Sequence, residues 1–457
     1  MNRKLRTWCI YLLCLGLTLV LLRSPPQVAA SPPPSPAPTE LRGVWLTNVA
    51  SGVLFVPGGV NWAMHQLAQL KFNTVYPVVW NRGHTYYPSS VAENVMGHSE
   101  EPLLWVMRLG GDVLAEIIKQ GQKRKLRVVP WFEYGFMAPK GSALARRHPD
   151  WLTNKRDSAK TLEEIPEELD LLNSDKQNAP PLSQRLKQFI RQRLVRNTVW
   201  LNPLQPDVQK FILDLIVEVV KKYDVAGIQL DDHFGMPVEL GYDSFTVQLY
   251  QKEHGGKRPP NDPLNAEWMR WRANKITDFV QRINKAVKAV KPKAIVSLSP
   301  NSQRFAYRAY LQDWQTWVER GLVDELVVQV YRGDSNSFFA ELSQPALQTA
   351  RDRIPVGIGI LSGLWRRPVT IEQIQQQVQS VRDRGFKGVS FFYWESLWGY
   401  LAPESPQKRR AAFRKLFSPS TTHTELHSNT VERKDKGDKE DKGEKVLQQS
   451  PRRLGQR

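Results

Sequence analysis

The feature of this chain that most constrains its fold is an eightfold alternation of short apolar segments with longer amphipathic ones. The short segments are rich in β-branched and aromatic residues, as buried strands are, and the longer ones repeat their apolar residues with the period of a helix. Repeated strand–helix units predict a parallel sheet covered by helices. The expected strands are residues 41–47, 74–79, 127–132, 227–231, 295–299, 325–329, 355–360 and 388–392.

Eight expected helices follow these strands. They are residues 61–70, 112–123, 207–222, 266–290, 311–319, 338–351, 371–384 and 407–416. Eight pairs in about 380 residues fit one closed barrel with insertions better than an open doubly wound sheet. The sequence has no Gly-rich dinucleotide fingerprint and no phosphate loop, either of which would favour the open sheet. We therefore predict an α/β fold consisting of a single (β/α)8 TIM barrel.

The barrel is expected to occupy residues 40–417 and to carry a long insertion after strand three. The insertion runs from about residue 135 to residue 201 and contains a strongly charged stretch, residues 154–196. Long βα loops lie on the catalytic face of such barrels, so we expect a lid or a wall of the substrate groove. The alternative is a surface excursion with no role in binding.

The segment before the barrel is typical of an exported protein. Residues 1–30 begin with basic residues, continue with an apolar run and end with small residues, which predicts a secretory signal peptide. The run is shorter than the ~20 residues that a membrane span needs, and the alternative is an uncleaved N-terminal anchor. Residues 31–39 form a stiff Pro-rich linker. We expect a periplasmic, envelope or extracellular location, with membrane contact only if the segment is kept.

Charge and cysteine content narrow the function classes. The chain carries a net charge of +19, and the charges of residues 418–457, an expected disordered tail, nearly cancel. The excess positive charge therefore lies mainly on the barrel and favours an acidic partner, which for an exported protein is a cell-wall glycan. Nucleic acid is not expected, because no binding motif for it is present. Both cysteines, Cys9 and Cys14, precede the linker, which leaves no disulfide and no thiol nucleophile beyond it.

Acidic residues concentrate where expected strands three, four and eight end, which is where barrel enzymes place their catalytic groups. Glu133, Asp231, Asp232 and Glu395 stand there beside Trp and Tyr residues. A glycosidase needs one carboxyl group to protonate the leaving oxygen and another as nucleophile or base. Because strand side chains alternate in direction, Asp231 should share the direction of Gln229, which ranks it above Asp232.

These positions define the expected roles. Asp231 is predicted as nucleophile or base and Glu395 as general acid, with Glu133 and Asp232 as alternates. The expected sugar-binding residues are Trp45, Trp80, Arg82, Tyr134, Gln229, His233, Asn301, Gln329, Tyr331 and Trp394. Retaining and inverting mechanisms stay open, because they differ in the separation of the carboxyl groups, roughly 5 Å against 6.5 to 9.5 Å.

Each candidate residue could also have a purely structural role. The two aspartates can cap the loop that follows them, Glu395 can form an ion pair with Arg82, and Glu133 can act as a support. Asp231, Asp232 and His233 could begin a metal site of a deacetylase or phosphodiesterase. The sequence offers few further ligands, so neither a metal nor another cofactor is expected. A Gly-x-Ser-x-Gly elbow for a serine hydrolase is also missing.

Several motifs, in this order, make the chain resemble glycosyl-hydrolase-like family ten, bacterial (β/α)8 proteins formerly described as a domain of unknown function. The resemblance covers about residues 40–417. The matching motifs are ELRGVW at 40–45, HPDWL at 148–152, WLNP at 200–203, GIQLDD at 227–232, LSP at 298–300 and QVY at 329–331.

The resemblance implies a secreted or envelope glycosidase, and some members resemble enzymes that cut peptidoglycan glycan strands stripped of their peptides. The double-aspartate motif falls on Asp231 and Asp232, and the sixth-strand motif on Gln329 and Tyr331. This chain departs from the pattern at His233, where many members have an aromatic residue, and at Arg332, where they have Trp. The exact substrate therefore stays open.

Two hypotheses from different classes follow. The first is an exported glycoside hydrolase acting on an envelope polysaccharide. The second is a non-catalytic barrel that binds carbohydrate or cell wall, since a barrel can keep its groove and lose its chemistry. The presence of an acidic partner within about 10 Å of Asp231 distinguishes them, because the enzyme needs two carboxyl groups facing one sugar.

Overall fold

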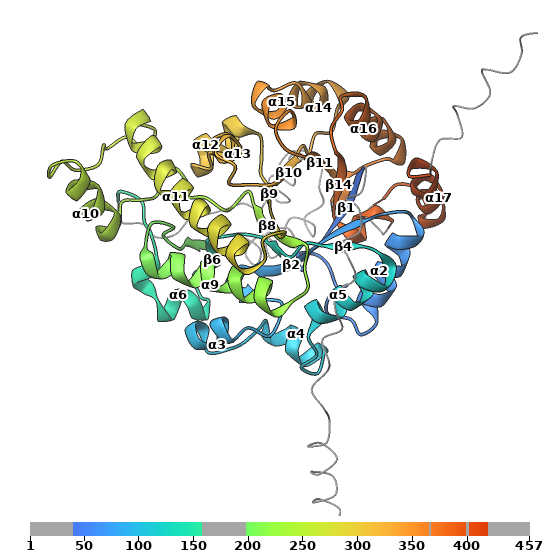
Figure 1. The fold of residues 1–457 in the computed structure, drawn as a ribbon, viewed down its shortest axis with the longest axis horizontal. Coiled ribbons are helices and arrows are strands. Elements are labelled where there is room, and N and C mark those ends of the chain that lie inside the picture. Colours follow the sequence, from blue (N-terminus) through green and yellow to red (C-terminus); the bar gives the residue numbers. More distant parts are fainter. Residues whose placement is uncertain (1–39, 158–197, 365–366, 399–401, 419–457) are drawn as a thin grey trace, which may run out of the picture. The chain divides into compact units, whose positions relative to one another are not determined.

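The computed structural model describes residues 40–157, 198–364, 367–398 and 402–418. Its core is a closed barrel of eight parallel strands surrounded by helices (Figure 1), as predicted. The first barrel strand pairs with both the second and the last, which closes the barrel. The barrel strands are β1 (Leu41–Leu46), β2 (Thr74–Asn81), β4 (Arg127–Val128) with β5 (Trp131–Phe132), β8 (Gly227–Asp231), β9 (Ile295–Ser299), β10 (Glu325–Gln329), β11 (Val356–Leu361) and β14 (Gly388–Phe392).

Two local features shape the barrel. The third strand is interrupted between β4 and β5, where Pro130 has no N–H group to continue the ladder. At the closing seam, Gly388 lies beside Leu41 with a φ of 135°. A Cβ atom there would approach the carbonyl oxygen of Leu41 to 2.1 Å, so only glycine fits this seam.

The eight expected helices lie near their predicted positions with two corrections, and α3, α4, α6 and α10 were not predicted. The helix expected at 338–351 is two helices, because Pro345 can begin a helix but cannot continue one. The helix expected at 311–319 is shorter and is preceded by an additional helix, α12. The helices are α2 (Gly59–Gln69), α3 (Ser90–Met96), α4 (Pro102–Met107), α5 (Val113–Arg124), α6 (Ala143–Arg147), α9 (Pro206–Lys222), α10 (Ser244–Glu253), α11 (Ala266–Val290), α12 (Gln303–Tyr310), α13 (Trp314–Glu319), α14 (Ser335–Leu342), α15 (Pro345–Arg351), α16 (Ile371–Asp383) and α17 (Pro406–Leu416), with the 3-10 turns η1 (Pro149–Trp151) and η2 (Trp394–Leu397).

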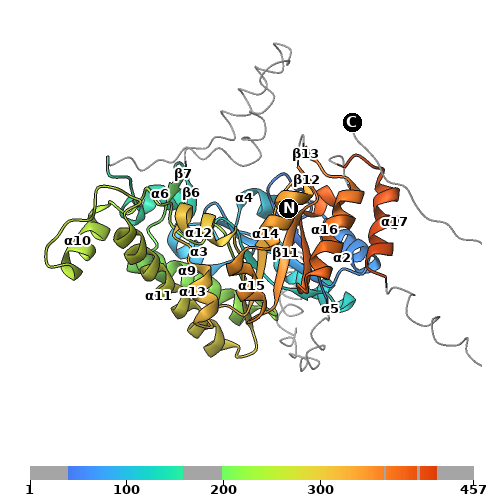
Figure 2. The ribbon, with the colours of Figure 1, turned by 90° about the horizontal axis from the view of Figure 1, so that it is seen from above.

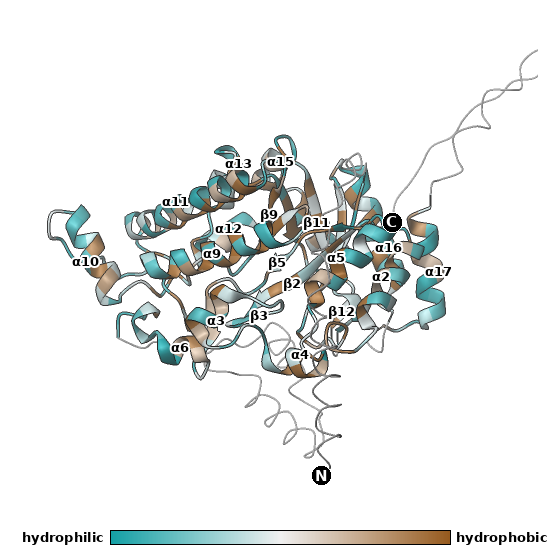
Figure 3. Cartoon of the chain, turned by 60° about the horizontal axis from the view of Figure 1, so that its bottom comes forward, coloured by the Kyte–Doolittle hydropathy of each residue, from teal (hydrophilic) through white to brown (hydrophobic). Residues whose placement is uncertain are grey.

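Hydrophobic residues on one side of each long helix hold the helices to the barrel. In α9, Val208, Phe211, Leu215 and Val219 are buried at the three- and four-residue spacing of a helical stripe. Figure 3 shows hydrophobic and hydrophilic residues alternating around α9 and α11, which pack against each other. Among the described residues, no helix is long and apolar enough to cross a membrane.

Three short antiparallel strand pairs accompany the barrel among the described residues. They are β2 with β3 (His84–Thr85), β6 (Met137–Pro139) with β7 (Thr198–Trp200), and β12 (Gly363–Leu364) with β13 (Arg367–Pro368). The β6–β7 pair lies beside α6 (Figure 2) and marks both ends of the long insertion after strand three. Most of the charged stretch, like the signal, linker and tail, lies outside the described residues, so their roles stay predictions.

The barrel interior contains an interior polar network made of Tyr76, Arg127, Gln229, Ser297 and Glu325. The Glu325 carboxylate accepts hydrogen bonds from Tyr76 Oη at 3.0 Å and Ser297 Oγ at 3.0 Å. Arg127 Nη2 lies 2.7 Å from its other oxygen, and Gln229 donates to Ser297 at 3.0 Å. The network therefore joins five barrel strands through directional bonds.

Glu325→Leu is expected to lower the free energy of unfolding by about 3 kcal/mol, because Arg127 and Tyr76 then lose their buried acceptor. Glu325→Gln should lose less, since the amide oxygen still accepts a hydrogen bond. Urea unfolding measures both changes. As a control, Glu319→Leu at the exposed end of α13 should stay within about 0.5 kcal/mol of the parent. A Glu325→Leu variant as stable as the parent would contradict the assigned role of the network.

Candidate active site

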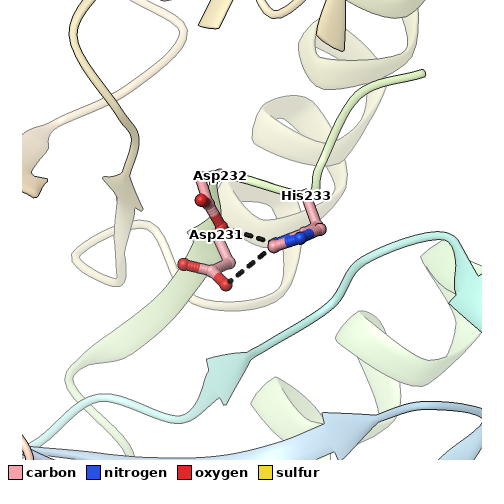
Figure 4. Close-up of side chains that lie close together, drawn as sticks. All are labelled: Asp231, Asp232 and His233. Carbon is pink, nitrogen blue, oxygen red and sulfur yellow. Dashed lines mark hydrogen bonds and ion pairs between the residues drawn. The ribbon is translucent and has the colours of Figure 1, made fainter. Parts of the chain in front are cut away.

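Two carboxylates and an imidazole meet where β8 ends (Figure 4). Asp231 is the last residue of β8, and Asp232 and His233 begin the loop that follows it. His233 Nδ1 lies 2.6 Å from Asp232 Oδ1 and 3.8 Å from Asp231 Oδ2. Both aspartates are buried, whereas His233 is half-buried. The three residues thus form one proton-sharing cluster on the face of the barrel where catalytic groups are expected.

Asp231 is held through both its side chain and its backbone. Gln329 at the end of β10 donates from Nε2 to Asp231 Oδ1 at 3.0 Å. Gln312, between α12 and α13, donates to the carbonyl oxygen of Asp231 at 2.9 Å. Gln229, two residues earlier on β8, bonds to Ser297 inside the barrel. Asp231 and Gln229 therefore point inward on the same side of the strand, as the alternation of side chains requires.

The two aspartates have different surroundings, which shift their pKa values in opposite directions. Burial, and then the charge of Asp232, raise the pKa of Asp231 to about 7. Burial alone would also raise the pKa of Asp232, but the His233 charge and the hydrogen bonds from His233 and Asn301 bring it below its usual range. Asn301 Nδ2 donates to Asp232 Oδ2 at 2.6 Å. Burial opposes the charge on His233, yet the Asp232 carboxylate raises the His233 pKa well above its usual value.

Glu133 supplies a third carboxyl group directly after the neighbouring strand β5. It is buried and accepts hydrogen bonds from Thr47 Oγ1 at 3.0 Å and Asn81 Nδ2 at 2.7 Å. Burial, followed by the negative charge of Asp231, raises the Glu133 pKa to about 8. At neutral pH, Asp232 is therefore ionised and Glu133 protonated. Such a separation between nearby acids is the pattern that assigns acid and base roles.

Glu395 lies in η2 after β14, in different surroundings. Its carboxylate accepts a hydrogen bond from the Ser51 hydroxyl and lies 3.4 Å from the Val53 backbone nitrogen. Burial raises its pKa, and the groups that act on it most after burial belong to residues 51–53 and to its own backbone. Arg82, considered above as its ion-pair partner, donates to the Tyr134 hydroxyl at 3.2 Å. The Asp231 charge is thus one of the main influences on the pKa of Glu133, and it is not among the main influences on the pKa of Glu395.

The three tryptophans expected to bind sugar are almost fully buried. Trp45, Trp80 and Trp394 are 1%, 0% and 1% exposed. Trp45 Nε1 donates to Gln229 at 2.8 Å, and Trp80 Nε1 donates to a backbone carbonyl at 2.8 Å. In this structure they offer no exposed ring face to a ligand and instead support the site.

The half-buried residues around the carboxylates provide the accessible surface. The Tyr134 ring lies 4.7 Å from the His233 ring, and the Arg82 guanidinium stands over Tyr134 at 4.6 Å. Tyr331 follows β10 and packs against Phe392 with ring centroids 5.7 Å apart. These side chains, together with the amides of Asn301 and Gln329, are of the kinds that bind sugar rings and hydroxyl groups in proteins.

Three residues of the site were not predicted from the sequence. Thr47 and Asn81 hold Glu133, and both stand at strand ends, where polar residues are a usable signal. Gln312 holds the backbone at Asp231 from 81 residues further along the chain. No pattern in the sequence indicates this contact, because it depends on how α12 packs against the loop after β8.

The atoms of the same cluster lie close enough together to bind one cation. Asp231, Asp232 and His233 each offer one ligand atom, and these atoms lie within 4.8 Å of one another. However, Asn301 and Gln329 direct N–H groups at the two carboxylates, and the Asp232 carboxylate stabilises a protonated His233. A metal ion binds oxygen lone pairs and deprotonated nitrogen atoms. Because the carboxylates here already accept hydrogen bonds and His233 holds a proton, the arrangement favours sharing of protons over binding of a metal.

Comparisons with known proteins identify the family of this chain. The family model described as Glycosyl hydrolase-like 10 matches residues 40–173 and 171–381. The chain is 24% identical to Glycosyl hydrolase DigH of Escherichia coli (strain K12) over 396 residues, 76% of this chain and 81% of that protein. It is 21% identical to Glycosyl hydrolase YngK of Bacillus subtilis (strain 168), over 64% of this chain and 54% of that protein.

Solved structures support the fold. The PgaB (BpsB) glycoside hydrolase domain from Bordetella bronchiseptica matches with a TM-score of 0.54 at 14% identity, covering 83% of this chain and 99% of that one. A β-galactosidase from Bacillus circulans sp. alkalophilus matches with a TM-score of 0.53 at 11% identity, covering 83% and 56%. The family model covers most of the barrel, and the chain belongs to the glycosyl hydrolase-like 10 family.

Proposed function

We propose that this protein is an exported glycoside hydrolase that cleaves an envelope polysaccharide, with peptide-free peptidoglycan strands as its substrate. The observation that carries the proposal is the pair Glu133 and Asp231, two buried carboxyl groups on neighbouring barrel strands whose pKa values lie near neutrality. The family and the names of its relatives support the reaction class. The basic charge of the chain and its N-terminal segment support an acidic, external substrate.

In the proposed reaction, Glu133 is the general acid. It donates its proton to the glycosidic oxygen as the bond from that oxygen to the anomeric carbon breaks. Asp231, once ionised, attacks the anomeric carbon or takes a proton from the attacking water. Asp232 keeps its negative charge and holds His233 as a cation beside the site. Glu133 replaces Glu395 as the first choice for the acid, because it is the carboxyl group that Asp231 influences.

The substrate-binding surface follows from the half-buried residues. Tyr134 and Tyr331 would contact the faces of sugar rings, and Asn301 and Gln329 would donate to hydroxyl groups when substrate displaces part of their present bonding. Arg82, stacked on Tyr134, would bind a hydroxyl group or an anionic group.

The test is digestion of purified glycan strands, with and without their peptides, followed by mass analysis of soluble products. We expect fragments with new reducing ends, released faster from peptide-free strands. Equal release from both would remove the peptide-free preference. Binding to the strands without any product would favour the alternative function, a non-catalytic barrel that binds cell wall, and would overturn the proposal. Chelator in the reaction should leave the rate unchanged, whereas loss of activity would favour a metal at Asp231, Asp232 and His233.

A further inference from the structure

The helix α12 is attached to the catalytic loop at both ends. Asn301, two residues before α12, donates to Asp232, and Gln312, two residues after it, donates to the Asp231 carbonyl oxygen. The carbonyl oxygen of Tyr310, the last residue of α12, accepts a hydrogen bond from the Met236 backbone at 2.8 Å. Because these contacts bond α12 to the loop that carries the carboxylates, the helix lies next to the site.

Aromatic rings connect the catalytic cluster to the surface of α12. The His233 and Tyr310 rings are 5.4 Å apart, and the Tyr310 and Phe305 rings are 6.1 Å apart. Phe305 is 49% exposed, so part of its ring is accessible to a ligand. An exposed ring that is connected to the catalytic cluster through Tyr310 is a suitable surface for a further sugar of a bound polymer.

Two arginines stand beside Phe305. Arg304 and Arg308 are one helical turn apart and therefore lie on the same face of α12. Both are exposed, and both line two hollows that flank the helix, with volumes of about 500 Å³ and about 800 Å³. The helix thus presents two cations and one aromatic ring between two recesses.

These two cations are not neutralised within the part of the chain that the structure describes. Other arginines that line the same hollows form ion pairs, Arg270 with Asp313 and Arg332 with Glu341. For Arg304 and Arg308, no carboxylate among the described residues lies within salt-bridge distance. Guanidinium groups bind carboxylates with two parallel hydrogen bonds, so the free pair is a suitable receptor for an anionic ligand.

We propose that the outer face of α12 is a subsite for a carboxylate-bearing sugar of the polymer, with Phe305 against the ring and Arg304 and Arg308 on the carboxylate. The inference rests on the proposed function and specifies its substrate class. Hydrolysis of the amide bond that joins a peptide to a glycan leaves a carboxylate on the sugar. A subsite of this kind would therefore distinguish peptide-free strands from intact ones.

The test uses the full chain with the double substitution Arg304→Gln and Arg308→Gln on two substrates. One is peptide-free strands with free carboxylates, and the other is the same strands with their carboxyl groups reduced to alcohols. We expect KM on the acidic strands to rise about five- to tenfold, with kcat unchanged, and KM on the reduced strands to stay the same. Raising the salt concentration should raise KM for the parent on acidic strands only.

A matched control removes two charges elsewhere. Arg320 and Arg353 are exposed and stand before β10 and β11, at the opposite ends of the strands from the site. Substituting both by Gln should leave KM on acidic strands unchanged. Equal KM values for the Arg304/Arg308 variant and the parent would overturn the subsite, as would a rise of the same size on both substrates.

Binding of acidic and reduced strands is measured in parallel. This measurement distinguishes a wrong subsite proposal from a wrong proposal of glycosidase activity. Binding by the parent that prefers acidic strands, and that weakens in the Arg304/Arg308 variant, would support the subsite even without cleavage. Absence of this preference would overturn the subsite even if cleavage occurs. Thermal unfolding of the variant should match that of the parent, because both side chains are exposed.

Discussion

Asp231→Asn is expected to reduce the turnover of glycan strands by about 10³-fold, because the amide can act neither as a nucleophile nor as a base. The substitution keeps the shape of the side chain, and its oxygen can still accept the hydrogen bond from Gln329. Binding of the strands should therefore be retained while release of products is lost. Product release measured by mass, together with the binding affinity, checks both expectations.

The control for this variant is an aspartate that has the same chemistry and lies far from the catalytic cluster in the fold. Asp383 is exposed at the end of α16 and accepts a hydrogen bond from Gln379. Asp383→Asn should change turnover by less than about twofold. Turnover by Asp231→Asn at the rate of the parent would remove Asp231 from the chemistry and leave the capping role considered from the sequence.

Glu133→Gln is expected to reduce turnover by about 10²- to 10⁴-fold, the contribution of a positioned general acid. The pH dependence gives a second signature. A base acts only above its pKa and an acid only below it, so kcat/KM of the parent should rise as Asp231 loses its proton near pH 7 and fall as Glu133 loses its proton near pH 8. In the Glu133→Gln variant, the remaining rate should keep the rise and lose the fall.

Glu395→Gln is the matched comparison, since both carboxyl groups were candidates for the acid. Its carboxylate bonds to Ser51 and not to the residues around Asp231 described above, so both limbs of the pH profile should remain in this variant. If Glu395→Gln instead abolished the alkaline limb and Glu133→Gln retained it, the original prediction of Glu395 as the acid would stand and the present assignment would be wrong.

Much of the fold was predictable because it depends on local patterns. The strands β8, β9, β10 and β14 begin and end at the predicted residues, since each is a short apolar run buried on both sides. The interruption at Pro130 and the division at Pro345 follow from proline chemistry and were available in the sequence. The helix α12 was not, because it is only eight residues long, which is too short for its apolar residues to repeat clearly with a helical period.

The site was predictable where a residue ends a strand and unpredictable where chain segments meet in space. Asp231, Gln229 and Gln329 follow from strand alternation and barrel geometry. The choice between Glu133 and Glu395 depended on which carboxyl group the fold brings to Asp231. The partners Thr47 and Gln312 likewise depend on tertiary contacts, which a single sequence without homologues does not reveal.

The interior polar network also bears on the fidelity of folding. A strand that slips by two residues keeps its inward and outward pattern, so a purely apolar barrel interior would tolerate the error. In this protein such a slip would separate Glu325 from Tyr76, Ser297 or Arg127 and bury a charge without its partners. Because an unpaired buried charge is strongly destabilising, a barrel with a misaligned strand would unfold again instead of persisting as a misfolded state.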